Sequence, residues 1–171
     1  MNLAVRSSGI SGRGVFTEEP IRKGQTIHRL GGERVSLLVC AGRIALGRVR
    51  MDDPLPIRKY EYLVLDDFSI CFNHSCAANA GLVKESDLVA LADIAPGEEI
   101  TFDYSLTMRR SFYSRFWSMP CGCRAGSCRG WVGDIRSVPI AHLRRYVEAG
   151  ALQDFIWDGL NIRGRKPARA S

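Results

Sequence analysis

Three cysteines within eight residues constrain this chain more than any other feature of its sequence. Cys121, Cys123 and Cys128 form a CxCxxxxC motif, and its glycines at positions 122 and 126 let the backbone double back. A structural Zn²⁺ site is normally tetrahedral with four protein ligands, so three thiolates leave it one ligand short. Three unrelated buried thiols are the less favoured interpretation. The motif therefore predicts a zinc site completed by a distant residue: Cys76, Cys71, Cys40 or a histidine.

Length and composition limit the chain to one well-buried core. It has 171 residues, of which 46% are hydrophobic, enough for one core and too few for two. No apolar run approaches the ~18–20 residues of a membrane span, and the N-terminus lacks a signal-peptide core. We therefore expect a cytoplasmic protein without a membrane partner; a nuclear or secreted-effector location stays open. Without an export signal, close-set cysteines favour metal binding over disulfides.

The charge of the chain indicates an anionic partner without naming one. The net charge is +6 with a pI near 9.2, and part of it comes from a tail rich in Gly, Pro and Ala. This tail, residues 163–171, is predicted to be basic and disordered. Such a charge is typical of nucleic-acid contact and equally of a soluble basic protein. Nucleic acid is therefore not required as a partner.

Short strands separated by Gly and Pro turns favour a compact fold that is mainly β with a few short helices. A helix is expected over Ser36–Leu46 with Ser36 as its N-cap, and the C-terminal end is expected to be helical. Gly31-Gly32 breaks the chain, and Gly47–Arg58 is interpreted as an irregular insert. The expected strands are Leu3–Arg6, Val15–Thr17, Thr26–Leu30, Tyr62–Leu65, Leu82–Lys84, Leu88–Ala92 and Glu99–Phe102, and the expected C-terminal helices are Pro139–Glu148 and Leu152–Trp157.

The stretch Phe72–Asn79 places two Asn, a His, a Ser and a Cys between two strand-like apolar runs. Buried polar side chains need hydrogen-bond partners or a ligand, because burying them unpaired is costly. For this stretch alone, a turn with a buried thiol is the favoured interpretation. The other motifs of the chain change that interpretation.

Four motifs, in order and spacing, resemble the SET-domain protein lysine methyltransferases with a post-SET zinc segment. They are Gly12–Phe16, Asn73–Cys76 with Asn79, Gly97–Tyr104, and Cys121–Cys128 followed by Arg129-Gly130. The resemblance implies a SET-type β fold of small curved sheets with a pseudoknot. It also implies a division into a SET-like catalytic domain (1–117), a post-SET zinc knuckle (118–133), a C-terminal helical segment (134–162) and the basic tail (163–171). Such a short chain resembles the compact bacterial members.

By this resemblance the chain is expected to transfer methyl groups from S-adenosylmethionine to a lysine amine of a protein substrate, a histone or another basic protein. The family's zinc ligands imply that Cys76 joins Cys121, Cys123 and Cys128 on one structural Zn²⁺. Two alternatives belong to other classes. One is a catalytically silent SET-like binding module, and the other is a zinc-knuckle nucleic-acid binder that uses the basic tail.

The resemblance also assigns the cofactor-binding residues. Gly12-Arg13-Gly14 resembles the loop whose main chain contacts the methionine part of the cofactor. Asn73 and His74 resemble the pair that holds it, His74 chiefly through its backbone. Trp131 is a candidate cover for the adenine, with packing between knuckle and core as the alternative.

The lysine channel is assigned in the same way. Tyr104 matches the family's catalytic tyrosine, and Phe102 falls where a Phe or Tyr tunes the number of methyl groups. Tyr62 matches a second channel tyrosine, with Tyr60 as a rival two residues away. Residues at i and i+2 of a strand share a face, so Phe102 and Tyr104 are expected side by side on one strand end. Ile70 and Cys71 replace the Arg-Phe pair often found in the family, which leaves the substrate preference open.

Overall fold

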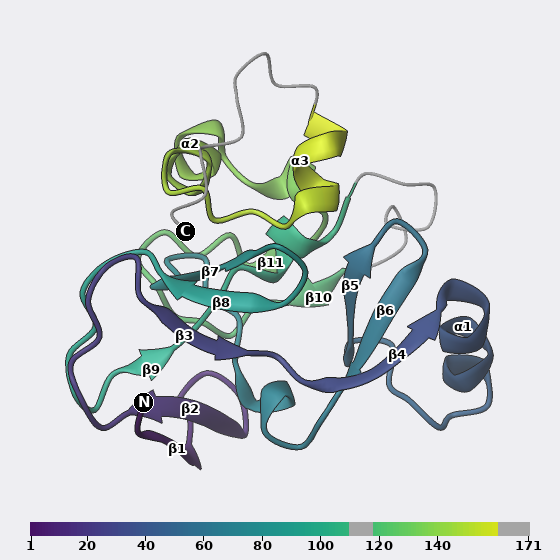
Figure 1. Cartoon of the computed structure of the whole chain (residues 1–171), viewed down its shortest axis with the longest axis horizontal. Coiled ribbons are helices and arrows are strands. Elements are labelled where there is room, and N and C mark those ends of the chain that lie inside the picture. The colour runs from purple at the N-terminus through teal and green to yellow at the C-terminus, as the bar shows by residue number, and fades with distance from the viewer. Residues whose placement is uncertain (110–117, 161–171) are drawn as a thin grey trace.

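Small antiparallel sheets dominate the computed structural model, which describes residues 1–109 and 118–160 (Figure 1). The first sheet has the order β1 (Leu3–Ser7), β2 (Arg13–Thr17) and β9 (Glu99–Ile100). The second is β3 (Thr26–Arg29), β8 (Asp87–Ala90) and β7 (Ala80–Val83). The third is β4 (Gly32–Ser36), β6 (Glu61–Leu65) and β5 (Pro54–Arg58), and β10 (Met119–Pro120) pairs with β11 (Trp131–Val132). The expected fold, mainly β with a few short helices, is confirmed.

Within residues 1–109 and 118–160, three α-helices accompany the sheets: α1 (Leu37–Ala45), α2 (Ile140–Glu148) and α3 (Asp154–Leu160). Ser36 is the N-cap of α1, as predicted, because its hydroxyl accepts a hydrogen bond from the Val39 backbone N–H at 3.4 Å. Figure 1 shows α1 at one edge beside β4 and β6, and α2 with α3 together at another end of the molecule. No helix among the described residues is long and apolar enough to cross a membrane.

Four strands of the described residues lie where the sequence predicted none: β4, β5 and the two-residue strands β10 and β11. Gly32–Ser36 forms β4 instead of a break, and the second half of the expected insert forms β5, Pro54–Arg58. Only Val35 of β4 is buried, so the strand lacks an alternating apolar pattern. Two prolines are tolerated in β5 because this strand lies at the edge of its sheet.

The main core lies where the sheets meet. Val15, Phe72, Leu88 and Ile100 are each no more than 1% exposed and belong to one apolar cluster. Phe102 pairs through its backbone with His74 and with Ala80, outside the named strands. These two bridges interlock the 73–80 segment with the residues after β9, at the place where the resemblance implies a pseudoknot.

A second apolar cluster holds the C-terminal helices against the sheets. It includes Leu91, Leu106, Tyr146 and Ile156. Gln153, which is 1% exposed, donates from Nε2 to the backbone oxygens of Pro56 and Glu85 at 2.9 and 2.5 Å. The helical end therefore packs against β5 and the β7–β8 turn.

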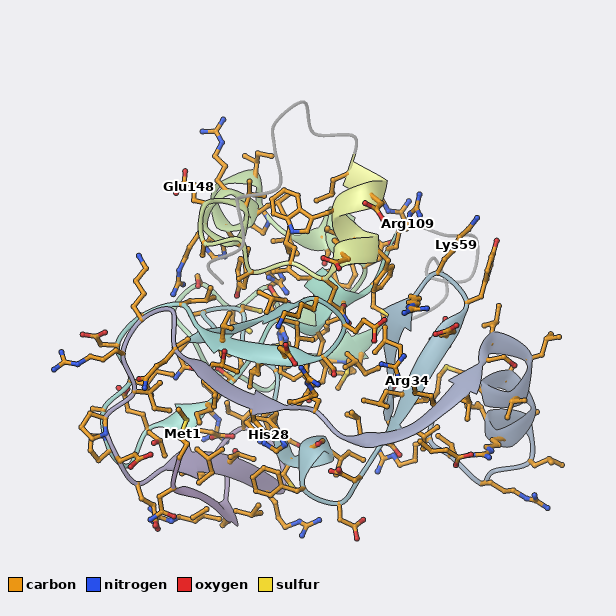
Figure 2. All side chains as sticks on the ribbon, in the orientation of Figure 1. Met1, His28, Arg34, Lys59, Arg109 and Glu148 are labelled. Atoms are coloured by element: carbon orange, nitrogen blue, oxygen red, sulfur yellow. The ribbon has the colours of Figure 1, made fainter. Side chains whose placement is uncertain are left out.

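Figure 2 shows Arg109 beside α3, where its guanidinium lies against Gly159.

The division of the chain into four parts stays a prediction. The basic tail (163–171) and residues 110–117 and 161–162 lie outside the described residues.

Candidate active site and metal centre

One cavity of about 1480 Å³ brings together most of the residues singled out from the sequence. Ligand pockets for small molecules span roughly 300–1,000 Å³, so this cavity has room for a cofactor and a protein segment. Trp131 lies outside its lining, is 50% exposed and packs against Gly133. Gly14 also lies behind the lining. The predicted site residues that line the cavity are Gly12, Arg13, Tyr62, Asn73, His74, Phe102, Tyr104 and Cys121.

The glycine loop is fixed from behind by Asn73 and Glu99. The Asn73 side-chain amide donates to the Arg13 backbone oxygen at 2.9 Å and to the Glu99 carboxylate at 2.7 Å. Gly12 has a φ of +46°, a region that favours glycine. At Gly14 a Cβ would overlap the Glu99 carboxylate. Asn73 therefore holds the loop that forms one wall of the cavity.

Glu99 supports the glycine loop, a role that the sequence did not lead us to assign. Its carboxylate accepts hydrogen bonds from Ser8 and Asn73, and it lies directly behind Gly14. The signal was present in the sequence, because Glu99 belongs to the Gly97–Tyr104 motif and begins a short strand. A carboxylate at such a position needs a partner, and the nearby amide and hydroxyl supply it.

The Tyr104 hydroxyl is held by one backbone oxygen at the cavity. It donates to the Phe72 carbonyl at 2.7 Å, and burial raises the pKa of Tyr104 above its ordinary value. The phenol therefore keeps its proton at neutral pH, and that proton is engaged with Phe72. The phenolic oxygen remains able to accept a hydrogen bond from a group bound in the cavity.

Phe102 and Tyr104 lie side by side, but the predicted strand end is wrong. The strand β9 stops at Ile100, and Tyr104 begins a 3₁₀-helix, η2 (Tyr104–Thr107). The two rings nevertheless pack with their centroids 4.8 Å apart. Asp103 turns the chain between them by accepting a hydrogen bond from the Ser105 backbone N–H at 3.1 Å.

Both tyrosines considered for the second channel position line the cavity. Tyr62 lies on β6 and is partly buried, which raises the pKa of its phenol. Tyr60 stands in the turn before that strand and is 58% exposed. Because both tyrosines line the same cavity, Tyr62 stays the predicted second channel tyrosine and Tyr60 stays the alternative.

A cluster of thiols lies next to the cavity. The ligand atoms of His74, Cys76, Cys121 and Cys123 all fall within 4.8 Å of one another. The thiol of Cys128 interacts with those of Cys121 and Cys123. All six cysteines are free. The fold thus brings Cys76 to the three cysteines of the CxCxxxxC motif, about 45 residues further along the chain.

Backbone N–H groups point at the sulfur atoms of this cluster. Arg129 N–H lies 3.4 Å from Cys76 Sγ, and Gly130 N–H lies 3.4 Å from Cys128 Sγ. Burial opposes ionisation of Cys123, but hydrogen bonds from the N–H groups of Cys76 and Ala125 and from the thiols of Cys121 and Cys128 together outweigh it and lower its pKa to about 6. N–H donors that stabilise thiolates fit a metal centre of this donor type.

His74 faces the same cluster through its imidazole. Its Nδ1 accepts the Tyr104 backbone N–H at 3.2 Å. Burial lowers the pKa of His74 to about 4, so the ring is neutral at pH 7, and because Nδ1 accepts the Tyr104 N–H, the ring proton is assigned to Nε2. This Nε2 lies 3.4 Å from Cys76 Sγ. His74 is therefore a hydrogen-bond donor to that sulfur, and the four thiols remain as candidate ligands.

Curated relatives of this chain are histone-lysine methyltransferases. An H3 lysine-4 specific enzyme of Cryptococcus neoformans is 30% identical over 145 residues, covering 73% of this chain and 9% of its own length. A human H3 lysine-36 specific enzyme is 28% identical over 140 residues, covering 71% and 5%. A Schizosaccharomyces pombe H3 lysine-9 specific enzyme is 30% identical over 86 residues, covering 39% and 18%. The chain thus spans less than a fifth of the length of these relatives.

These relatives support protein lysine methylation at the level of the family. The profile of the SET domain matches residues 12–105, from the glycine loop to the residue after Tyr104. This match covers more than half of the 171 residues. The chain therefore belongs to the SET domain family.

Proposed function

We propose that this protein is an S-adenosylmethionine-dependent protein-lysine N-methyltransferase. The observation that carries the proposal is the convergence of the glycine loop, the Asn73-His74 pair and Tyr104 on one cavity. The loop and the pair would hold the cofactor, and Tyr62, Phe102 and Tyr104 would line the lysine channel. When bound, S-adenosylmethionine supplies an electrophilic methyl group for an in-line displacement.

The target amine must be neutral to attack. A free lysine has a pKa of about 10.4, so very little of it is neutral at pH 7. Burial in an apolar channel disfavours the ammonium form. The Tyr104 oxygen, whose own proton is donated to Phe72, would accept an N–H of the amine and direct its lone pair. Tyr104 thus positions the nucleophile and keeps its own proton.

We further propose that Cys76, Cys121, Cys123 and Cys128 bind one Zn²⁺. Four thiolates complete a tetrahedron and leave no open position for water or substrate, which makes such a site structural. Residues 118–133, called here the zinc segment, would close one side of the cavity, because Cys121 and Gly122 belong to its lining.

The substrate class follows from the relatives. Their names assign three different lysines of histone H3, so the family does not select one target for this chain. We propose a lysine in a histone or another basic protein as the acceptor.

Labelled methyl transfer tests the proposal. The purified full chain is incubated with methyl-labelled S-adenosylmethionine and a panel of histones, DNA-packaging proteins and ribosomal proteins. Label on a lysine, located by mass spectrometry, is the expected result. A chain that binds S-adenosylhomocysteine but labels no protein would favour the silent module. Salt-dependent nucleic-acid binding without cofactor affinity would favour the zinc-knuckle nucleic-acid binder.

A further inference from the structure

Cys76 is joined to Tyr104 by a chain of hydrogen bonds through the His74 imidazole. On one side, His74 Nε2 lies 3.4 Å from Cys76 Sγ. On the other, Nδ1 accepts the Tyr104 backbone N–H at 3.2 Å. The rings of His74 and Tyr104 also pack edge to face, with centroids 5.4 Å apart. One side chain thus contacts both the thiol cluster and the backbone of the tyrosine.

A second link runs from Cys76 through Arg129. The Arg129 backbone N–H lies 3.4 Å from Cys76 Sγ. Its guanidinium donates to the two Asp103 carboxylate oxygens at 2.7 and 2.8 Å, and to Ser105 Oγ at 3.0 Å. The side chains of Arg129 and Asp103 are only 8% and 1% exposed. Because Asp103 directly precedes Tyr104, this link also ends at the tyrosine.

The Arg129–Asp103 pair has the geometry that fixes a backbone. Two parallel N–H···O bonds define direction as well as distance, which a single bond does not. Removing one partner of a buried pair leaves an uncompensated charge, so the pair resists opening. Asp103 also caps η2 through the Ser105 N–H, so the turn that carries Tyr104 depends on this carboxylate.

We propose that Arg129, Asp103 and the His74 imidazole are positioning residues that transmit order in the thiol cluster to Tyr104. The inference rests on the proposed function, because it takes Tyr104 as the residue that orients the amine. Displacement by about 1 Å of a positioned group can cost on the order of 10²-fold in rate. The zinc segment would then support the catalytic geometry as well as the cavity wall.

A merely structural pair would give a different result. If Arg129 only fastens the zinc segment to the core, its loss lowers stability and leaves the folded enzyme with its normal turnover. If Arg129 positions Tyr104, its loss lowers kcat with little change in KM. The Tyr104 amide gives a readout that needs no activity, because its exchange with solvent reports on the bond to His74.

The test uses the zinc-loaded full chain as parent, Arg129→Gln, Arg129→Lys and Asp103→Asn. Arg29→Gln is the control, since Arg29 forms a two-bond pair with buried Asp87 between β3 and β8. NMR follows exchange of the Tyr104 amide against the Ala90 amide, which is bonded to Gln25 O. Steady-state kinetics on the protein substrate identified by methyl labelling give kcat and KM.

We expect Arg129→Gln to speed Tyr104 amide exchange and lower kcat at least about tenfold, with unchanged Ala90 exchange and cofactor affinity. Arg129→Lys keeps the charge, so its Tyr104 exchange rate and its kcat should lie between those of the parent and of Arg129→Gln. This variant replaces Arg129→Gln in the test if the Gln variant does not fold. Parental exchange and kcat in folded variants, or faster exchange with parental kcat, would overturn the proposal. If the parent transfers no methyl, the proposed function fails, while the exchange measurement still decides whether the link exists.

Discussion

At the scale of single residues, the proposed function depends most on the Tyr104 hydroxyl. We predict that Tyr104→Phe lowers turnover on the order of 10²-fold, because it deletes one positioned polar group and keeps the ring. Fold, zinc content and affinity for S-adenosylhomocysteine should stay near parental values. Initial rates of labelled methyl transfer measure the change.

Tyr146→Phe is the matched control for this substitution. Tyr146 is 3% exposed in the second core, where its hydroxyl has no hydrogen-bond partner among the described residues. Its removal is expected to leave turnover intact. Equal rates for Tyr104→Phe and the parent would make Tyr104 a packing residue.

Phe102→Tyr is predicted to shift the product toward monomethyl-lysine. Phe102 is 4% exposed and its ring packs against Tyr104, so an added hydroxyl would occupy space that a methylated amine needs. The parent is expected to proceed to di- or trimethyl-lysine. A mass-spectrometric time course on one substrate separates the two patterns. An unchanged product distribution would show that Phe102 does not limit the channel.

Individual contacts could not be derived from the sequence, although most residue types could. Asn73, His74, Phe102 and Tyr104 were identified, and all four line the cavity. The donation from Tyr104 to Phe72 and the pairing of Arg129 with Asp103 depend on the three-dimensional approach of distant segments. No local pattern encodes such an approach.

At the scale of elements, the zinc segment is predicted to depend on Cys76. Cys76→Ser should reduce zinc content well below one ion per chain, loosen residues after Cys121 and weaken S-adenosylhomocysteine binding, because one wall of the cavity is lost. Metal analysis and calorimetry measure these effects. Cys40→Ser is the control for zinc content, because Cys40 is buried in α1 outside the cluster. Full zinc content in Cys76→Ser would remove this residue from the ligand set.

The sheet of β3, β8 and β7 is predicted to lose stability in acid through Asp87. Hydrogen bonds from Arg29 lower the pKa of this carboxyl. A lowered folded-state pKa adds stability above the unfolded value of about 3.9, and this is lost as pH falls through the folded-state pKa. Asp87→Asn should therefore lower the free energy of unfolding by about 1–3 kcal/mol at pH 7. The free energy of unfolding of this variant should also fall less steeply with acidification than that of the parent.

Denaturant unfolding at neutral and acidic pH checks this prediction. Glu61→Gln is the control, because its ion pairs with Arg34 and Arg58 are exposed and 3.8–4.0 Å long. Such pairs contribute little to stability. If the free energy of unfolding falls as steeply with acidification in Asp87→Asn as in the parent, the role given to Asp87 is contradicted.

Sequence patterns identified elements rich in regularly spaced apolar residues and missed the others. The helix after Ser36 and strand β6 follow from such patterns. Strand β4 is polar except for Val35, and β5 contains two prolines. Both are held by pairing with β6, a tertiary effect that local propensity does not carry.

At the scale of the whole molecule, the fold brings four distant segments to one cavity. The glycine loop, the Asn73-His74 pair, η2 and the zinc segment meet there. Phe102, two residues before η2, forms backbone bridges with His74 and with Ala80. The resemblance of the four sequence motifs to those of the SET-domain methyltransferases predicted this convergence. The packing of the C-terminal helices on β5 through Gln153 was not predicted, because that segment lies beyond the SET domain match.

The central claim is that this cavity transfers methyl groups to a protein lysine. The most direct measurement is intact-protein mass spectrometry followed by peptide mapping. The sample is the protein substrate identified by methyl labelling, incubated with the zinc-loaded chain and S-adenosylmethionine. The account predicts mass increases in steps of one methyl group, confined to lysine and strongly slowed by Tyr104→Phe. Cofactor binding without any mass increase on the protein panel, or methylation that is independent of Tyr104, would contradict it.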